Sequence, residues 1–301
     1  MTIYQQAAHF LSPLFPDIPT NEARPFVTLT YAQSIDGKIA GSNGQQLILS
    51  GNGSMIMTHR LRTMHDGIMV GIGTILNDDP RLSVRLVDPS DPTPPRQPQP
   101  IILDTHLRFP LGAKLLHNFQ SGAGKAPWIV TAAIDGEDAE KRARQVRSRF
   151  VADRDLVAKI IGRSRRKDNP RPPHRIRYVR FETSCIATPT FSSPLLRPGH
   201  TSLPDLLSLL RRHHGIATLM IEGGARVIQA CLGAVGHVDL LVVTVAPTIV
   251  GRDGVAATGE MAGEVGFTTP ATAAPRFPRL DDVRYEQFGR DIVMAARPAW
   301  D

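Results

Sequence analysis

The stretch DGIMVGIGTILNDDPRLSVR, residues 66–85, governs how the rest of the chain is interpreted. An apolar run at 68–70 has the length and composition of a short buried strand. Glycines and turn-forming residues follow it, which predicts a loop over 71–80. Apolar residues then alternate with polar ones over 82–86, which predicts a second strand.

Glycine at the end of a buried strand lets the backbone approach a ligand closely, because no side chain intervenes. In this stretch the hydroxyl of Thr74 and the carboxylate of Asp78 are suited to binding sugar or phosphate groups. The same pattern also fits a loop that only turns the chain between two strands. Taken alone, the stretch leaves both interpretations open.

A second glycine-containing strand end occurs in LMIEGGARVIQACL, residues 219–232. An apolar strand ends at Glu222, Gly223 and Gly224 follow, and a helix is predicted from Ala225. Backbone N–H groups at a helix start attract anions, and the helix dipole adds to the attraction. Strand-glycine-helix junctions are common, so the motif gains meaning only if folding brings it beside Thr74. We expect the two strand ends to form one cradle for a dinucleotide and a phosphorylated sugar.

Composition places the chain among globular proteins. It has 301 residues, of which 42% are hydrophobic and 21% charged, enough for one large domain or two small ones. Its two cysteines form no CxxC pair, which argues against a disulfide framework or structural zinc. No run approaches the ~20 apolar residues of a membrane helix, and no secretory signal is apparent. We therefore expect a soluble, cytoplasmic protein that does not bind membranes.

Strand-like and helix-like segments alternate along the chain, which predicts an α/β layered architecture. A hairpin expected at 285–295 makes the central sheet mixed, with helices on its flanks. Residues 1–24 are expected to be a lead-in, and 25–301 a single domain. The predicted strands are 25–31, 68–72, 101–104, 128–131, 177–181, 219–222 and 238–246, and the predicted helices are 4–11, 55–64, 137–150, 202–215 and 225–232.

Five motifs occur in a fixed order: TYAQSIDGKIA (30–40), LRTMHDGIMVGIGTILNDDPRLSVR (61–85), PIILDTHLRFP (100–110), LMIEGGARVIQACL (219–232) and VDLLVVTVAPTIVG (238–251). Together they resemble the pyrimidine reductases of riboflavin biosynthesis, which share a fold with dihydrofolate reductase. The resemblance implies NADPH-dependent reduction of a ribosylamino-pyrimidine 5′-phosphate to its ribitylamino form, without a metal. It also implies a homodimer, for which the apolar strand 238–246 is a candidate interface.

The resemblance implies specific contacts for the cofactor. Thr74 and Asp78 match its cofactor-binding motif, and Gly223, Gly224, Ala225 and Arg226 are expected to hold the pyrophosphate. The remaining cofactor candidates are Ala32 and Ile48 on the nicotinamide side, and Thr105 after the strand at 101–104.

For the substrate, the resemblance implies that Arg62 and Arg85 bind the phosphate, since guanidinium matches it in charge and geometry. Glu222 is expected to contact the pyrimidine or ribose, with Gln46 and Leu82 in the same pocket. Asp36, Lys38 and Glu222 are the candidate catalytic residues. From the residues alone, Asp36 and Lys38 also fit a solvated turn, and Arg62 fits an exposed helix face.

Bacterial relatives often carry an N-terminal zinc deaminase, whose ligand motifs do not occur here. The chain in this respect resembles fungal and archaeal members, in which reduction precedes deamination. We therefore expect the 2,5-diamino-pyrimidinone as substrate; the deaminated uracil form and a folate or pterin are the alternatives. A non-catalytic nucleotide- or RNA-binding protein on the same scaffold is a further alternative.

The net charge of +7 is unevenly distributed. Residues 141–180 hold 15 Lys and Arg against 3 Asp and Glu, so the rest of the chain is net acidic. Few aromatic residues accompany these cations, although single-strand binders need them for stacking on bases. We therefore interpret 150–200 as a basic, partly disordered insertion and regard nucleic-acid binding as disfavoured.

Overall fold

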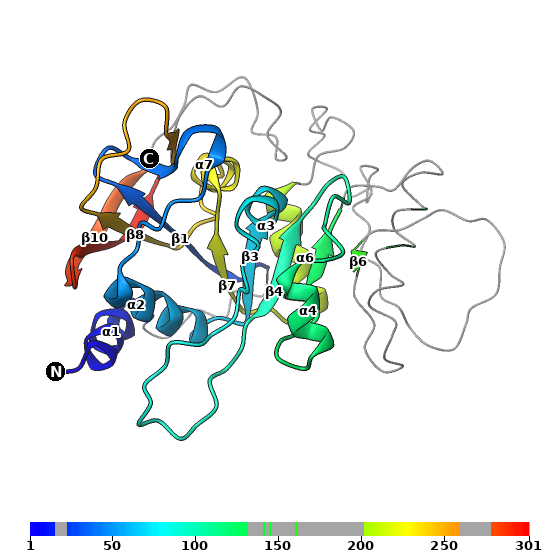
Figure 1. Cartoon of the computed structure of the whole chain (residues 1–301), viewed down its shortest axis with the longest axis horizontal. Coiled ribbons are helices and arrows are strands. Elements are labelled where there is room, and N and C mark those ends of the chain that lie inside the picture. Colours follow the sequence, from blue (N-terminus) through cyan, green and yellow to red (C-terminus); the bar gives the residue numbers. More distant parts are fainter. Residues whose placement is uncertain are drawn as a thin grey trace.

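The computed structural model describes residues 1–15, 23–131, 202–258 and 278–300, together with Lys141, Gln145, Ile160 and Ile161. A nine-stranded sheet, in the order β10-β11-β8-β1-β7-β3-β4-β5-β6, forms its centre (Figure 1). Strands β8 to β6 are mutually parallel, whereas β11 runs antiparallel to both β8 and β10. The predicted mixed α/β sheet is confirmed.

The elements have the following bounds. The strands of the large sheet are β1 (Phe26–Ser34), β3 (Gly67–Gly71), β4 (Gln99–Leu103), β5 (Trp128–Val130), β6 (Ile160–Ile161), β7 (Thr218–Glu222), β8 (Leu240–Ala246), β10 (Arg279–Phe288) and β11 (Asp291–Ala299). A small sheet pairs β2 (Lys38–Ala40) with β9 (Val255–Ala256). The helices are α1 (Ile3–Leu11), η1 (Ser12–Leu14), η2 (Ser42–Gly44), α2 (Asn52–Thr63), α3 (Ile72–Asp78), α4 (Lys114–Gln120), α6 (Leu203–His214) and α7 (Ala225–Gly233).

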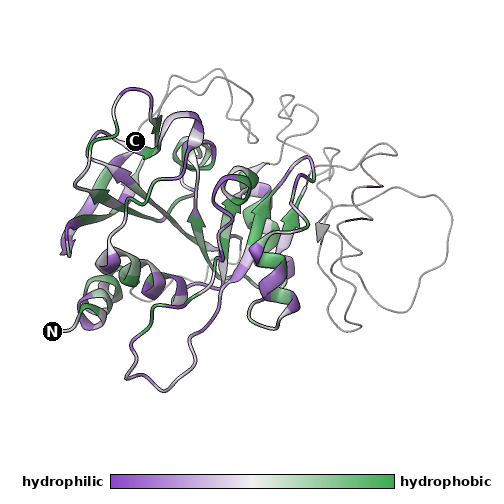
Figure 2. Cartoon of the chain, in the orientation of Figure 1, coloured by the Kyte–Doolittle hydropathy of each residue, from purple (hydrophilic) through white to green (hydrophobic). Residues whose placement is uncertain are grey.

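Helices cover both faces of the sheet, whose inner strands are mostly apolar, whereas each helix has an apolar and a polar side (Figure 2). On one face, α6 and α7 pack on β1, β3, β4 and β5. On the other face, α3 and α4 cover β3 to β5, and α1 and α2 cover β7, β8 and β11. Burial on both faces explains why the parallel strands are continuous apolar runs.

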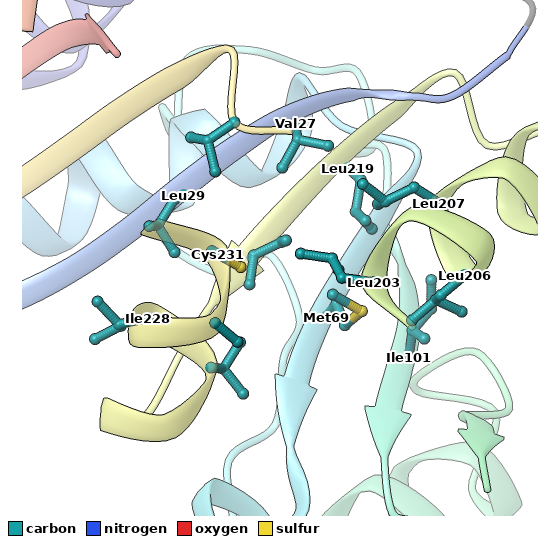
Figure 3. Close-up of a cluster of buried hydrophobic side chains, with 14 of the residues drawn as sticks. Val27, Leu29, Met69, Ile101, Leu203, Leu206, Leu207, Leu219, Ile228 and Cys231 are labelled. Atoms are coloured by element: carbon teal, nitrogen blue, oxygen red, sulfur yellow. The ribbon is translucent and has the colours of Figure 1, made fainter. Parts of the chain in front are cut away.

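The largest cluster joins β1 to α6 and α7 (Figure 3). Its buried side chains include Val27, Leu29, Leu203, Leu206, Leu207, Ile228 and Cys231. Cys231 is fully buried on α7, and burial raises the pKa of its thiol to about 12. The cysteine is therefore a core residue, as its position on the predicted helix indicated.

The segment after β3 differs from the prediction. Residues 72–78 form helix α3 where a loop was expected, and no strand forms over 82–86. Leu82 and Val84 do alternate into the core, but their backbone bonds to side chains in place of a strand. The N–H of Val84 donates to Gln97 Oε1 (2.8 Å), and the N–H of Arg85 donates to His59 Nδ1 (2.9 Å). The alternating pattern over 82–86 predicted burial correctly, but the prediction that this segment pairs as a strand was wrong. The edge of β3 that it could have joined is already paired with β4.

Helix α2 begins three residues earlier than the prediction placed it. Its N-cap is Gly51, which makes no side-chain cap bond, and the carboxylate of Asp291 at the start of β11 lies against this helix start. The buried Asp291 accepts bonds from the N–H of Gly51 (2.7 Å) and from the hydroxyl of Ser54. A tertiary contact thus anchors the start of α2, whereas α6 is capped locally: the Ser202 hydroxyl accepts from the N–H of Asp205, and Gly215 ends the helix with φ 68°.

Several predictions concern parts of the chain outside the described residues. They are the helix at 137–150, the strand at 177–181 and the basic insertion at 150–200.

His65, just after α2, makes folding sensitive to pH. It is fully buried, its Nδ1 lies 2.8 Å from the Leu61 carbonyl and its Nε2 2.9 Å from the Thr28 hydroxyl. Burial lowers its pKa to about 4. The unfolded chain, with a histidine pKa near 6.5, takes up a proton that the folded chain excludes. Stability is therefore full above about pH 6.5 and is lost as pH falls toward 4.

We expect this histidine to cost the fold about 3–4 kcal/mol across that window, since its pKa falls from about 6.5 to about 4 and one pKa unit corresponds to about 1.4 kcal/mol. Urea unfolding at about pH 5 and 7 measures the change, in a range where most carboxylates stay ionised. His65→Gln, which does not titrate, should remove the share of His65 and leave that of buried His59, whose pKa is also lowered, to about 3. Equal wild-type stability at the two pH values would contradict the assignment.

Candidate active site

A cavity of about 1020 Å³ opens at the carboxyl ends of the parallel strands. Residues from six neighbouring strands line it: Thr244, Thr30, Glu222, Gly71, Leu103 and Val130, on β8, β1, β7, β3, β4 and β5. Strands lie ~4.8 Å apart, so the cavity extends roughly 24 Å across the sheet. Ligands of open α/β sheets bind at this edge, and the volume suits two of them side by side.

The two glycine-containing strand ends meet in this cavity. Thr74 and Gly224 both line it, and a Cβ built on Gly224 would lie only 3.4 Å from Thr74 Oγ1. The expectation that these stretches fold against each other is confirmed. β7 and β3 are adjacent in the sheet, which places the residues after each strand together.

The start of helix α7 faces the cavity beside Thr74. Its N-cap, Gly224, is extended (φ −75°, ψ 170°), and the N–H of Val227 closes the first turn on the Gly224 carbonyl (2.9 Å). Helix geometry leaves the earlier N–H groups, at Ala225 and Arg226, without a carbonyl partner in the helix. Gly223 packs tightly instead, because a Cβ there would lie 3.2 Å from the N of Ile228. The junction can therefore receive an anion.

Arg62 and Glu222 form a two-pronged ion pair in the cavity wall. Arg62 Nε and Nη2 donate to the two carboxylate oxygens of Glu222 at 2.6 and 2.8 Å, and Nη1 donates to the Ser83 carbonyl (3.0 Å). Arg62 is only 7% exposed. The exposed-face interpretation of Arg62 is therefore wrong. Its fork is engaged by Glu222, so the arginine orients that carboxylate as well as adding positive charge.

Arg85 carries the second predicted phosphate contact but lies outside the cavity lining. Its side chain is exposed and bonds to Ser83 (3.1 Å to the hydroxyl). Burial and the neighbouring charges of Arg62 and Arg81 lower its pKa. The same cations act on buried His59. Its pKa is lowered to about 3, mainly by burial and further by the charges of Arg62 and Arg85. Positive charge is thus concentrated beside the Arg62 end of the cavity.

Most of the other predicted ligand residues line the cavity. They are Ala32, Gln46, Thr74, Asp78, Thr105, Glu222, Gly223, Gly224, Ala225 and Arg226. Burial raises the pKa of Asp78, which stands on α3. The structure brings these residues together from five separate stretches of sequence.

Four predicted residues besides Arg85 lie outside the cavity lining: Asp36, Lys38, Ile48 and Leu82. Asp36 is a latch between loops: it accepts bonds from the Ser34 hydroxyl (2.6 Å) and from the N–H groups of Val250 (3.0 Å) and Gly251 (2.8 Å). These bonds lower the pKa of Asp36 to about 2, and the bond from the Ser34 hydroxyl has the largest effect. A carboxyl group with so low a pKa is a poor proton donor near neutral pH. Lys38 stands on β2 outside the lining, so the two do not form a catalytic pair at the cavity.

Ile48 and Leu82 do not contact the ligand cavity, for opposite reasons. Ile48 is 90% exposed on the loop before α2, and it does not line the cavity. Leu82 is 2% exposed and packs in the core beneath α3. Neither side chain reaches the cavity, although both belong to segments that border it.

The sequence reasoning missed several residues at the cavity, among them Asp104, His106 and Arg108, which line it after β4. The motif PIILDTHLRFP was noticed, but only Thr105 was assigned a role. Charged side chains directly after a buried parallel strand were the available indication. Within the residues that the structure describes, His, Cys, Asp and Glu nowhere gather in threes as a metal site needs, and no helix is long and apolar enough to cross a membrane.

Comparison with known proteins agrees with this site. The profile of the RibD C-terminal domain matches residues 25–294. The chain belongs to the RibD C-terminal domain family. The predicted membership of an oxidoreductase family is thereby confirmed, and the cavity at the strand ends is the candidate active site of a RibD-type reductase.

Individual relatives support the same assignment. The 2,5-diamino-6-ribosylamino-4(3H)-pyrimidinone 5′-phosphate reductase of Candida glabrata is 30% identical over 96% of this chain and 95% of its own length. The riboflavin biosynthesis protein RibD of Aquifex aeolicus is 39% identical over 91% of this chain and 58% of its own. The structure of the Saccharomyces cerevisiae riboflavin biosynthesis reductase Rib7 superposes with a TM-score of 0.60 at 26% identity, covering 97% and 99% of the two chains.

Proposed function

We propose that this protein reduces 2,5-diamino-6-ribosylamino-4(3H)-pyrimidinone 5′-phosphate to its ribitylamino form with NADPH, in riboflavin biosynthesis. One observation carries the proposal: a single cavity joins the open start of α7 to the Arg62–Glu222 pair. The first suits the pyrophosphate of a dinucleotide, and the second suits a polar, phosphorylated sugar.

The reaction depends more on the positioning of cofactor and substrate than on general acid–base catalysis. In its ring-opened form the ribosylamine is an imine, whose C1′ accepts a hydride while its nitrogen gains a proton. Bound NADPH would supply the hydride. The protein's task is to hold the two molecules in register and to exclude water.

The cavity residues divide this task. We assign the pyrophosphate to Gly224, Ala225 and Arg226, and sugar hydroxyl groups of the cofactor to Thr74 and Asp78. Glu222, oriented by Arg62, faces the substrate ring or ribose, and the substrate phosphate lies toward the Arg62–Arg85 side, where positive charge is concentrated.

The diamino substrate is preferred over the deaminated uracil because the fungal relatives that align over nearly their whole length are named for it. NADPH, a homodimer and a cytoplasmic location are further proposals that rest on the family. The dimer interface would not be the 238–246 strand, because β8 is flanked by β1 and β11 inside the sheet.

The proposal is tested by mixing purified protein with NADPH and each pyrimidine in turn. We expect loss of NADPH absorbance with the diamino compound and a product heavier by two hydrogen atoms. Faster turnover of the uracil form would move the protein to the alternative substrate. No oxidation with either pyrimidine, in protein that is folded by circular dichroism, would refute the reductase assignment.

A further inference from the structure

Residues 83–85, here called the strap, form neither helix nor strand, so their backbone groups need partners from elsewhere in the chain. Gln97 takes both groups of the middle residue. Its Oε1 accepts a bond from the N–H of Val84 (2.8 Å), and its Nε2 donates to the Val84 carbonyl (3.0 Å). The other bonds to the strap come from helix α2.

Helix α2 holds both ends of the strap. Arg62 Nη1 donates to the Ser83 carbonyl (3.0 Å), and the N–H of Arg85 donates to His59 Nδ1 (2.9 Å). Residues three positions apart lie on the same side of a helix, so His59 and Arg62 act from one face of α2. Arg62 also binds the carboxylate of Glu222. One helix face therefore sets the place of that carboxylate and of the strap.

His59 is fully buried and serves as a neutral acceptor. Because its Nδ1 accepts the bond from Arg85, its ring proton is on Nε2. This Nε2 has no hydrogen-bond partner among the residues that the structure describes, and a buried donor of that kind is costly. An apolar side chain would fill the same space without the cost. The bond to Arg85 is thus the reason for a histidine at this position.

The residue that His59 holds carries the guanidinium group assigned to the substrate phosphate. Partial burial, then the charges of Arg62 and Arg81, lower the pKa of Arg85, while the charge of Glu222 opposes them. These mutual effects place the Arg85 guanidinium near the Arg62–Glu222 pair of the cavity wall. A shift of the Arg85 backbone would carry the guanidinium group with it, away from a ligand that lies beside the pair.

We infer that His59 is the positioning residue of the substrate-phosphate site: by accepting the N–H of Arg85, it fixes the strap so that the Arg85 guanidinium meets a phosphate monoester. His59 does not touch the substrate and acts only through Arg85. The inference rests on the proposed function, since the ester is the 5′-phosphate of the proposed substrate.

Two substitutions of His59 test the role of its acceptor. His59→Leu removes the acceptor, whereas His59→Asn keeps one, because the asparagine oxygen is as many bonds from Cα as Nδ1 is. We expect His59→Leu to raise the KM of the phosphorylated pyrimidine roughly tenfold, with kcat and the NADPH dissociation constant changed less than about twofold. His59→Asn should restore most of the wild-type KM.

The dephosphorylated pyrimidine isolates the phosphate. It offers Arg85 no anion to bind, so kcat/KM for this compound should be the same in wild type, His59→Leu and His59→Asn. Steady-state kinetics with both compounds therefore distinguish a misplaced guanidinium group from general damage to the cavity.

A double variant tests whether His59 acts through Arg85. Arg85→Ala should raise the KM of the phosphorylated pyrimidine by itself. Adding His59→Leu to it should raise KM less than about twofold further, because the group that His59 positions is already gone. Effects that multiply in the double variant would show that His59 acts by another route.

His65→Leu is the matched control. His65 is also fully buried, but its ring contacts the Leu61 carbonyl and the Thr28 hydroxyl and not the strap. This variant should lower stability and leave both KM values unchanged. Should His59→Leu fail to fold in melting curves, His59→Gln replaces it and should raise KM likewise, since its amide lies one bond farther out than Nδ1.

The outcomes separate this inference from the function on which it rests. If wild-type protein oxidises NADPH with neither pyrimidine, the proposed function fails. If the wild type is active and the His59 variants leave KM unchanged, or raise it equally for the phosphorylated and dephosphorylated compounds, only the role of His59 is overturned.

Discussion

Replacing Arg62 by alanine should lower the free energy of unfolding by about 2–4 kcal/mol and kcat/KM by roughly 100-fold or more. The variant leaves the Glu222 carboxylate without its two-pronged partner in a wall where Arg62 is 7% exposed. An unpaired, partly buried carboxylate is costly, and here it would also lose the orientation needed to meet the substrate. Urea unfolding and steady-state kinetics measure the two effects.

The chain offers a closely matched control for this change. Arg24 donates two bonds of 2.6 and 2.7 Å to Asp239, with side chains 20% and 24% exposed against 9% and 21% for the Arg62–Glu222 pair, and neither residue lines the cavity. Arg24→Ala should therefore lower stability comparably and leave kcat/KM nearly unchanged. If both variants reduce activity equally, the Arg62 effect is one of stability alone.

A double variant separates the charge of Arg62 from its hold on Glu222. Arg62→Met combined with Glu222→Gln removes both charges and should recover part of the lost stability, because no unpaired ion is left behind. Activity should stay low. Recovery of activity together with stability would show that neither side chain meets the substrate.

Replacing Gly224 by valine should weaken NADPH binding by roughly 100-fold while changing the free energy of unfolding by less than about 1 kcal/mol. The backbone of Gly224, at φ −75° and ψ 170°, already has the extended conformation that valine prefers. Its Cβ would lie 3.4 Å from Thr74 Oγ1, and the methyl groups would enter the space before α7. The loss would therefore come from the ligand, and fluorescence titration with NADPH measures it.

Gly112→Val serves as the comparison, because a Cβ at Gly112 meets nothing within 4 Å and the residue lies outside the cavity. It should bind NADPH as the wild type does. Unchanged binding by Gly224→Val would place the dinucleotide away from the start of α7, and the division of the cavity proposed above would have to be abandoned.

Much of the architecture was predictable because it depends on short-range patterns. Apolar runs such as 219–222 and 240–246 became buried parallel strands, and α6 follows directly from its Ser202 cap, its leucine spacing and Gly215. The error over 72–86 has a different origin. There the burial of Leu82 reflects packing against α3 and α4, while the backbone N–H groups of Val84 and Arg85 bond to distant side chains, which no local period records.

The candidate site was likewise predictable only where short-range sequence patterns mark its residues. Thr74 and Gly224 were identified because each follows an apolar strand, and the sheet order then placed them together. Asp36 was misassigned because an Asp-Gly turn looks the same whether its carboxylate faces a ligand or holds a neighbouring loop. Arg108 was passed over because nothing in its own segment shows that the residues after β4 border the cavity.

The amino-acid sequence by itself determined most of the buried parallel strands, the locally capped helix α6, the two glycine junctions and the family to which the chain belongs. Only the tertiary structure decided which charges are engaged: Glu222 with Arg62, 160 positions apart, Asp36 with the turn at 250–251, and Asp291 with the start of α2. The physical reason is range. Secondary structure arises from contacts within a few residues, whereas a side chain's partner depends on how the sheet and its loops come together.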